Sequence, residues 1–205
     1  MRSDGQARRE AILDAALECF GKQGVVSTGI EDIRKRAKAS PSSVYHLFGS
    51  LEGILLALLI RTFERLFRSL AAAVTKTKDA EAAVRALVRA QLDWTLANPV
   101  EARVMYQAMT LESSPKLVRP LAERKAELLA PVVVHLQRFV DDGSLPRWDP
   151  LTFDFVLLGV THEASRRFLA GAPLDPAWMR RELPRMAWAS LPKPRSVERS
   201  SKETS

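Results

Sequence analysis

Cysteine, histidine and recognisable catalytic motifs are scarce in this chain of 205 residues. Cys19 is the one cysteine, so the chain cannot form an intrachain disulfide or a thiolate metal cluster. Its position in an apolar helical stripe predicts a buried core thiol. The three histidines, His46, His135 and His162, are scattered along the sequence, which indicates neither a zinc site nor a Cys–His nucleophile pair.

Sequence motifs of enzymes and of membrane proteins are also missing. There is no G-x-G-x-x-G, no P-loop and no H-E-x-x-H, because His162-Glu163 lacks the second histidine. Uncharged apolar stretches such as residues 53–60 are much shorter than the roughly 18 apolar residues of a membrane span. Residues 1–10 carry three arginines without a following apolar run, unlike a secretory signal. We therefore expect a cytoplasmic protein that is not an enzyme, with no catalytic residue, metal or cofactor.

The charge of the chain favours an anionic partner only weakly. The formal net charge is +7, but residues 1–50 hold 8 basic and 6 acidic residues, and residues 191–205 hold 4 and 2. Because the excess is spread thinly, charge alone does not identify a nucleic-acid-binding protein.

The spacing of apolar residues predicts helix over nearly the whole chain. Apolar side chains recur every three or four positions in residues 12–20, and Gly21 and Gly24 supply the stop. Similar patterns and capping residues predict eight further helices, at about 29–37, 41–48, 51–75, 79–97, 98–110, 117–140, 151–170 and 175–191. No segment alternates apolar and polar residues between turns, so the predicted fold class is all-α.

Two domains and a tail are expected from this arrangement. Residues 1–50 are predicted to form a three-helix domain. Residues 51–191 are predicted to form a second, larger helical domain. Residues 192–205 are polar and rich in proline, and we expect them to be a disordered tail.

The two short helices within residues 30–48 carry the helix-turn-helix prediction. Thr28 is expected to cap the first and Ser40 the second, with Pro41 at the first helical position, where its missing N–H costs nothing. Helices of about eight residues are not stable alone, so they need the first and fourth helices as a platform. In this motif the second helix lies in the major groove. With Val44 and Leu47 or Phe48 facing inward, the outward side chains are Ser42, Ser43, Tyr45 and His46.

Residues 8–60 resemble the TetR family of transcriptional repressors. The resemblance rests on the joint spacing of residues 11–16, Phe20, Gly24, Thr28, Asp32-Ile33, Ala37, Ser40, Val44-Tyr45-His46 and Phe48. It implies that residues 1–50 form a helix-turn-helix DNA-binding domain and residues 51–191 a domain for effector binding and dimerisation. The protein would then be a homodimer that binds a palindromic operator in double-stranded DNA and releases it when a small-molecule effector of unknown identity binds the C-terminal domain.

The sequence departs from the family pattern at two places. Lys38 occupies the turn position where the family usually has glycine, and a non-glycine residue in a left-handed conformation costs of order 1 kcal/mol. The family also typically offers a basic residue after Phe48, where this chain has Gly49-Ser50-Leu51. Lys38 is a candidate replacement for that phosphate contact. The predicted DNA-binding residues are Thr28, Lys38, Ser40, Ser42, Ser43, Tyr45 and His46.

Effector binding is expected from the resemblance, which places a cavity among the helices at about 79–142 and 151–170. His162 and Arg166 lie four residues apart on one helix face, where polar groups need partners. They are candidates for holding an anionic or hydrogen-bonding effector, or for a salt bridge near Glu163 or with a partner subunit. The candidates by composition are Trp94, Met105, Tyr106, Met109, Phe139, Phe155, His162 and Arg166.

The last two predicted helices carry more apolar surface than a monomer can bury, so we expect them to pack against a second copy of the chain in a four-helix arrangement. The predicted interface residues are Phe153, Val156, Val160, Phe168, Trp178 and Met186.

Two functions remain open at the level of the sequence. The first is a ligand-responsive DNA-binding transcriptional regulator, which we expect to be a repressor that a small-molecule effector releases from a palindromic operator. The alternative is a helical protein-interaction module with a degenerate helix-turn-helix, which the lack of a basic residue near Ser50 keeps open.

Overall fold

The computed structural model describes residues 2–110 and 115–192, and all regular elements in those ranges are helical, as predicted. In chain order they are α1 (Arg2–Gln23), α2 (Ile30–Arg36), α3 (Pro41–Phe48), α4 (Leu51–Val74), α5 (Ala80–Ala97), α6 (Pro99–Thr110), α7 (Pro115–Asp141), α8 (Pro150–Phe153), the π-helical turn η1 (Asp154–Leu158), α9 (Gly159–Leu169) and α10 (Pro176–Ala189). The tail expected at 192–205 lies outside the described residues, except for Pro192.

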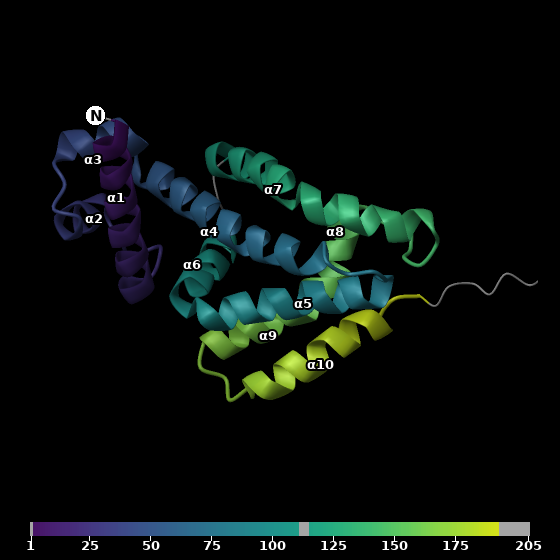
Figure 1. The fold of residues 1–205 in the computed structure, drawn as a ribbon. Helices are drawn as coiled ribbons and strands as arrows, with labels where there is room; N and C mark the ends of the chain where they lie inside the picture. The colour runs from purple at the N-terminus through teal and green to yellow at the C-terminus, as the bar shows by residue number, and fades with distance from the viewer. Residues whose placement is uncertain (1, 111–114, 193–205) are drawn as a thin grey trace, which may run out of the picture.

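The first three helices form a small bundle at one end of the molecule (Figure 1). α1 packs against α2 and against the first half of α4, which also contacts α3. The buried side chains include Ile12 and Phe20 of α1, Ile33 of α2, Val44 of α3 and Ile54 of α4. The short helices α2 and α3 therefore rest on the platform that the sequence predicts.

α4 continues from this bundle into the larger C-terminal body, where it packs against α5 and α7 (Figure 1). α5 also packs against α10, and it contacts α9. Ten side chains of α4 are buried. No single described helix is both long and apolar enough to span a membrane, and α3 with α4 passes that test only as a pair, across a bend of 61°.

Two elements differ from the sequence prediction. α1 spans 22 residues, extending more than one turn before the apolar stripe at 12–20. The helix expected over 151–170 is divided into α8, η1 and α9. The π-helical turn inserts a wider ring into the hydrogen-bond ladder, and apolar periodicity does not signal such an insertion.

Candidate nucleic-acid interface and effector region

Local contacts at both ends define α3, the candidate recognition helix. The Ser40 hydroxyl accepts a hydrogen bond from the Ser43 N–H (3.2 Å), and Pro41 occupies the first helical position, as predicted. The helix ends at Gly49, whose φ of 72° favours glycine and whose N–H donates to the Tyr45 carbonyl (2.9 Å).

The orientation of α3 matches the predicted one. Val44 is buried, and Leu47 and Phe48 pack against the core. On the opposite face Ser42 and His46 are exposed, and Tyr45 is 54% exposed. Ser43 is only half-exposed, because it lies at the flank of the outward face.

Thr28 does not cap α2, so that prediction is wrong. The N-cap is Gly29, and the Asp32 carboxylate reaches back to accept from the Gly29 N–H (2.9 Å). The Thr28 hydroxyl instead donates to the Gly24 carbonyl (2.8 Å), and the residue is only 2% exposed. A phosphate contact through this hydroxyl would require that bond to break.

The turn between α2 and α3 adopts the left-handed conformation at Lys38. Lys38 has a φ of 50° and is the one non-glycine residue with a positive φ among the described residues. Arg34 closes the turn, since its backbone carbonyl accepts from the Ala39 N–H (3.1 Å) and its guanidinium donates to the Ala39 carbonyl (3.3 Å). The Lys38 side chain remains exposed beside the start of α3.

Three consecutive residues of α2 are basic, Arg34, Lys35 and Arg36, and the two arginines form ion pairs within the protein. Arg34 pairs with Glu31 (2.8 Å), which lowers the pKa of the Glu31 carboxyl. Arg36 forms an ion pair with Glu18 of α1.

Two arginines of α1 contact α3, and sequence reasoning missed both. Arg8 donates from Nη1 to the Ser43 hydroxyl (3.3 Å). The Arg9 guanidinium lies 5.6 Å from the centroid of the Phe48 ring, within range of a cation–π interaction. The signal was the pair Arg8-Arg9 one turn before Ile12, which becomes informative only once α1 is known to begin at Arg2.

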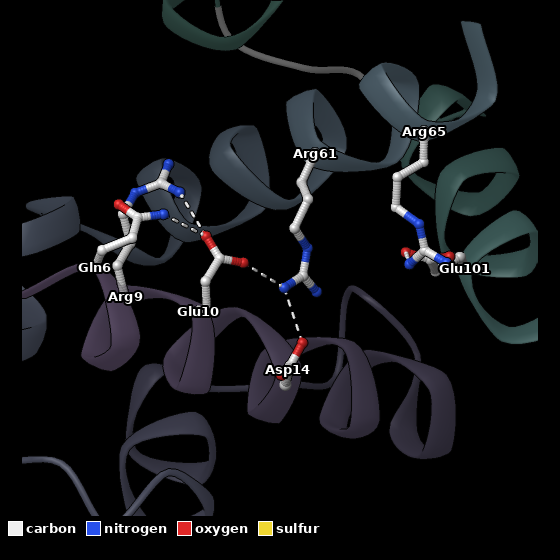
Figure 2. A network of polar contacts seen from close by, with 7 residues as sticks. All are labelled: Gln6, Arg9, Glu10, Asp14, Arg61, Arg65 and Glu101. Atoms are coloured by element: carbon white, nitrogen blue, oxygen red, sulfur yellow. Dashed lines mark hydrogen bonds and ion pairs between the residues drawn. The ribbon is translucent and has the colours of Figure 1, made fainter. Parts of the chain in front are cut away.

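Ion pairs join α1, α4 and α6 (Figure 2). Arg61 of α4 donates to Glu10 (2.9 Å) and Asp14 (2.8 Å), both of α1. One turn further, Arg65 of α4 pairs with Glu101 of α6 (2.7 Å). α4 therefore makes charged contacts with both the helix-turn-helix bundle and the C-terminal body.

A surface hollow of about 300 Å³ lies where α1, α4 and α6 meet, lined by Leu17, Arg65 and residues 98–101. Beside it, α1 approaches α6 closely, since a Cβ on Gly21 would lie 2.6 Å from Val100 Cγ1. The glycine thus permits this approach between the helix-turn-helix bundle and α6.

The candidate effector region contains one hydrogen-bonded chain of polar groups. The Tyr106 hydroxyl of α6 lies 3.0 Å from His162 Nδ1 of α9, and Gln91 of α5 donates to the same hydroxyl (3.4 Å). His162 Nε2 is 3.9 Å from Asp154 Oδ1. Burial raises the pKa of Tyr106. Burial also acts to raise the pKa of Asp154, but the hydrogen bond and charge of His162, with the charge of Lys125, lower it overall.

The other effector candidates are dispersed. Trp94, Met105 and Phe139 are buried in the core, while Met109 and Phe155 are largely exposed. Arg166 is exposed and donates two hydrogen bonds to the Glu163 carboxylate (2.9 Å each). Sequence reasoning missed two buried hydroxyls, Thr95 of α5 and Ser165 of α9, which act on the Tyr106 hydroxyl to lower its pKa against the larger effect of burial.

The predicted dimer residues vary in exposure. Val160 (61%), Met186 (46%) and Trp178 (36%) are exposed. Phe153, Val156 and Phe168 are half-buried. The terminal helices α9 and α10 therefore present apolar side chains to the outside of the single chain.

Comparisons with known proteins connect this arrangement to a family. The family described as "Bacterial regulatory proteins, tetR family" matches residues 12–58. The HTH-type transcriptional regulator BetI of Rhizobium meliloti is 34% identical over 82 residues, which are 40% of each chain. The HTH-type transcriptional repressor Rv1474c of Mycobacterium tuberculosis is 31% identical over 134 residues, covering 64% of this chain and 66% of that protein. The chain thus matches less than two thirds of the length of these relatives.

Solved structures share the fold over nearly the whole chain. A TetR family transcription regulator from Marinobacter aquaeolei VT8 has a TM-score of 0.77 at 18% identity, covering 94% of this chain and 100% of that one. The transcriptional regulator FadR from Bacillus subtilis, solved in complex with stearoyl-CoA, has a TM-score of 0.71 at 14% identity and covers 88% and 98%. The match over the helix-turn-helix, the curated relatives and the common fold together show that the chain belongs to the TetR family of bacterial regulatory proteins.

Proposed function

We propose that the protein is a cytoplasmic, ligand-responsive repressor that binds a palindromic DNA operator as a homodimer. The observation that carries this proposal is the placement of α3, which is braced from behind by α1 and α4 and turns polar side chains outward. A helix held in this way fits the major groove of a duplex. Rv1474c, to which the chain is similar, is named as a repressor.

DNA contact is assigned to the outward face of α3 and its surroundings. Ser42, Tyr45 and His46 supply hydroxyl and imidazole groups for phosphates or base edges. The other contributors are Lys38 from the turn, Ser40 and Ser43 from the start of α3, and Thr28 after a change of hydrogen-bond partner. Residues 1–50 make up the DNA-binding domain.

Effector binding is assigned to the domain formed by residues 51–191. Tyr106 and His162 are the polar anchors of the site, since they already form one hydrogen-bonded pair between α6 and α9. Trp94, Met105, Met109, Phe139, Phe155 and Arg166 are the further contributors. The FadR neighbour, solved with stearoyl-CoA bound, supports ligand binding on this fold without defining the ligand of this chain.

A gel mobility shift with the DNA upstream of the chain's own gene tests DNA binding. We expect a sequence-specific shift that weakens steeply with salt, because phosphate contacts release counterions. Tyr45→Ala and Lys38→Ala should weaken this shift while leaving the thermal unfolding midpoint nearly unchanged, because both side chains are exposed.

Two results would count against the proposal. If the wild-type chain gives no sequence-specific shift with this DNA or with duplexes selected from a random library, the protein-interaction module is the better explanation. If Tyr45→Ala and Lys38→Ala lower stability as much as they lower binding, those side chains are structural.

A further inference from the structure

The outward face of α3 lacks the groups that usually attract DNA phosphates. Between Ser40 and Ser50 there is no arginine or lysine. In α2, Arg34 and Arg36 form ion pairs with Glu31 and Glu18. A helix in the major groove needs cations nearby, because phosphate contacts supply most of the salt-dependent affinity.

Arg8 of α1 brings a guanidinium to the flank of α3. It is exposed, and its Nη1 donates to the Ser43 hydroxyl (3.3 Å). The same hydroxyl lies 2.8 Å from the Ser40 hydroxyl, which caps α3. The guanidinium therefore lies beside the start of the candidate recognition helix.

Helix geometry defines on which side of α3 this guanidinium lies. Successive residues are rotated by about 100°, so Ser43 is about 60° from His46 and about 100° from Ser42 around the axis. Ser42 and His46 mark the exposed face, and Ser43 marks its edge. When a helix lies in a groove, the sugar–phosphate chains run along its flanks and the base edges lie beneath its centre.

We propose that Arg8 contacts a backbone phosphate at the edge of the groove occupied by α3 and supplies, from α1, a positive charge that α3 lacks. The inference rests on the proposed function. The guanidinium has five N–H donors in a planar fork, so it can bind a phosphate oxygen while another N–H remains on Ser43. Because the contact is to the backbone, Arg8 contributes to affinity for any duplex and not to sequence preference.

The test measures the salt dependence of binding to a duplex that the wild-type chain selects from a random library. The Arg8→Gln variant keeps an N–H donor for Ser43 but removes the charge. The slope of log K against log salt is negative, and we expect its magnitude to decrease by about 0.9 for each phosphate that is no longer neutralised, or about 1.8 for a dimer. The ratio of affinities for the selected and a scrambled duplex should stay within about twofold of the wild-type ratio.

Two further variants separate a phosphate contact from a structural brace. Arg8→Lys keeps the charge and should keep the wild-type slope. Arg147→Ala removes one exposed arginine from the loop between α7 and α8 and controls for net charge.

Failure of the proposed function and failure of the Arg8 inference give different results. If the wild-type chain selects no duplex, the proposed function fails and this inference with it. If the wild-type chain binds but Arg8→Gln keeps the wild-type slope, or Arg8→Lys reduces the size of the slope as much as Arg8→Gln does, Arg8 braces α3 and only this inference is overturned.

Discussion

At the scale of single residues, Glu101 is the least exposed carboxylate among the ion pairs that α4 makes with α1 and α6. It is 5% exposed and forms its ion pair with Arg65, which is half-exposed. Breaking such a pair leaves a desolvated charge without its partner, and this cost exceeds the value of the pair itself.

We predict that Arg65→Ala lowers the free energy of unfolding by about 1–3 kcal/mol, less than the removal of one partner from a fully buried pair, because Arg65 reaches water. Urea unfolding measures the change. The matched control is Arg119→Ala, whose pair with Glu123 is exposed on both sides and whose effect should stay within about 0.5 kcal/mol. Equal effects of the two substitutions would show that Glu101 is solvated or has another partner.

Residues also show where sequence reasoning succeeds. Ser40, Pro41 and Gly49 act on their own backbone neighbours, so the ends of α3 were predictable from local chemistry. Thr28 was misassigned because a hydroxyl can bond either forward to a helix start or back to a preceding carbonyl. Sequence alone does not decide between these two partners.

At the scale of elements, Lys38 in the turn between α2 and α3 has a strained backbone conformation and is also a proposed DNA contact. Lys38 has a φ of 50°, where its Cβ is crowded by the backbone. Glycine has no such penalty at positive φ, although it also increases the entropy of the unfolded chain.

We predict that Lys38→Gly raises the free energy of unfolding by up to about 1 kcal/mol, because relief of the left-handed strain exceeds the entropic cost. Lys38→Ala is the matched control: it removes the same side-chain charge but keeps the Cβ, so its stability should stay near the wild-type value. Thermal or urea unfolding compares the two variants. Equal stabilities of Lys38→Gly and Lys38→Ala would refute the strain argument.

Elements built from distant parts of the chain were harder to predict. The helical pattern identified α2 to α7 within a few residues, since apolar periodicity is a local property. It did not reveal that Arg8 meets Ser43, 35 residues away. It also did not reveal the π-helical turn η1, which places Asp154 opposite His162. These contacts depend on how helices pack, which one sequence does not specify.

At the scale of the whole molecule, α4 connects the two parts of the chain. Arg61 bonds to α1, while Arg65, one turn along the same helix, bonds to α6. A displacement of α6 would therefore act on α4 through Arg65 and on α1 through the close contact between Gly21 and Val100. These connections provide a contiguous route between the proposed effector region and the DNA-binding domain.

The apolar face of α9 and α10 leads to the last prediction, which concerns assembly. Val160 and Met186 are exposed in the single chain, and burying them against a second copy would remove apolar surface from water. A glutamate at either position would place a charge inside that interface without a partner. We predict that Val160→Glu with Met186→Glu halves the molar mass measured by light scattering.

Loss of the dimer should also weaken operator binding by about two to four orders of magnitude, because each subunit then binds its half-site alone. Val118→Glu is the control, since it places the same charge at an exposed apolar position of α7 and should leave both mass and affinity unchanged. A double variant that keeps the mass of a dimer would mean that subunits associate through another face. One that becomes monomeric yet binds the operator with wild-type affinity would show that recognition needs only one copy of α3.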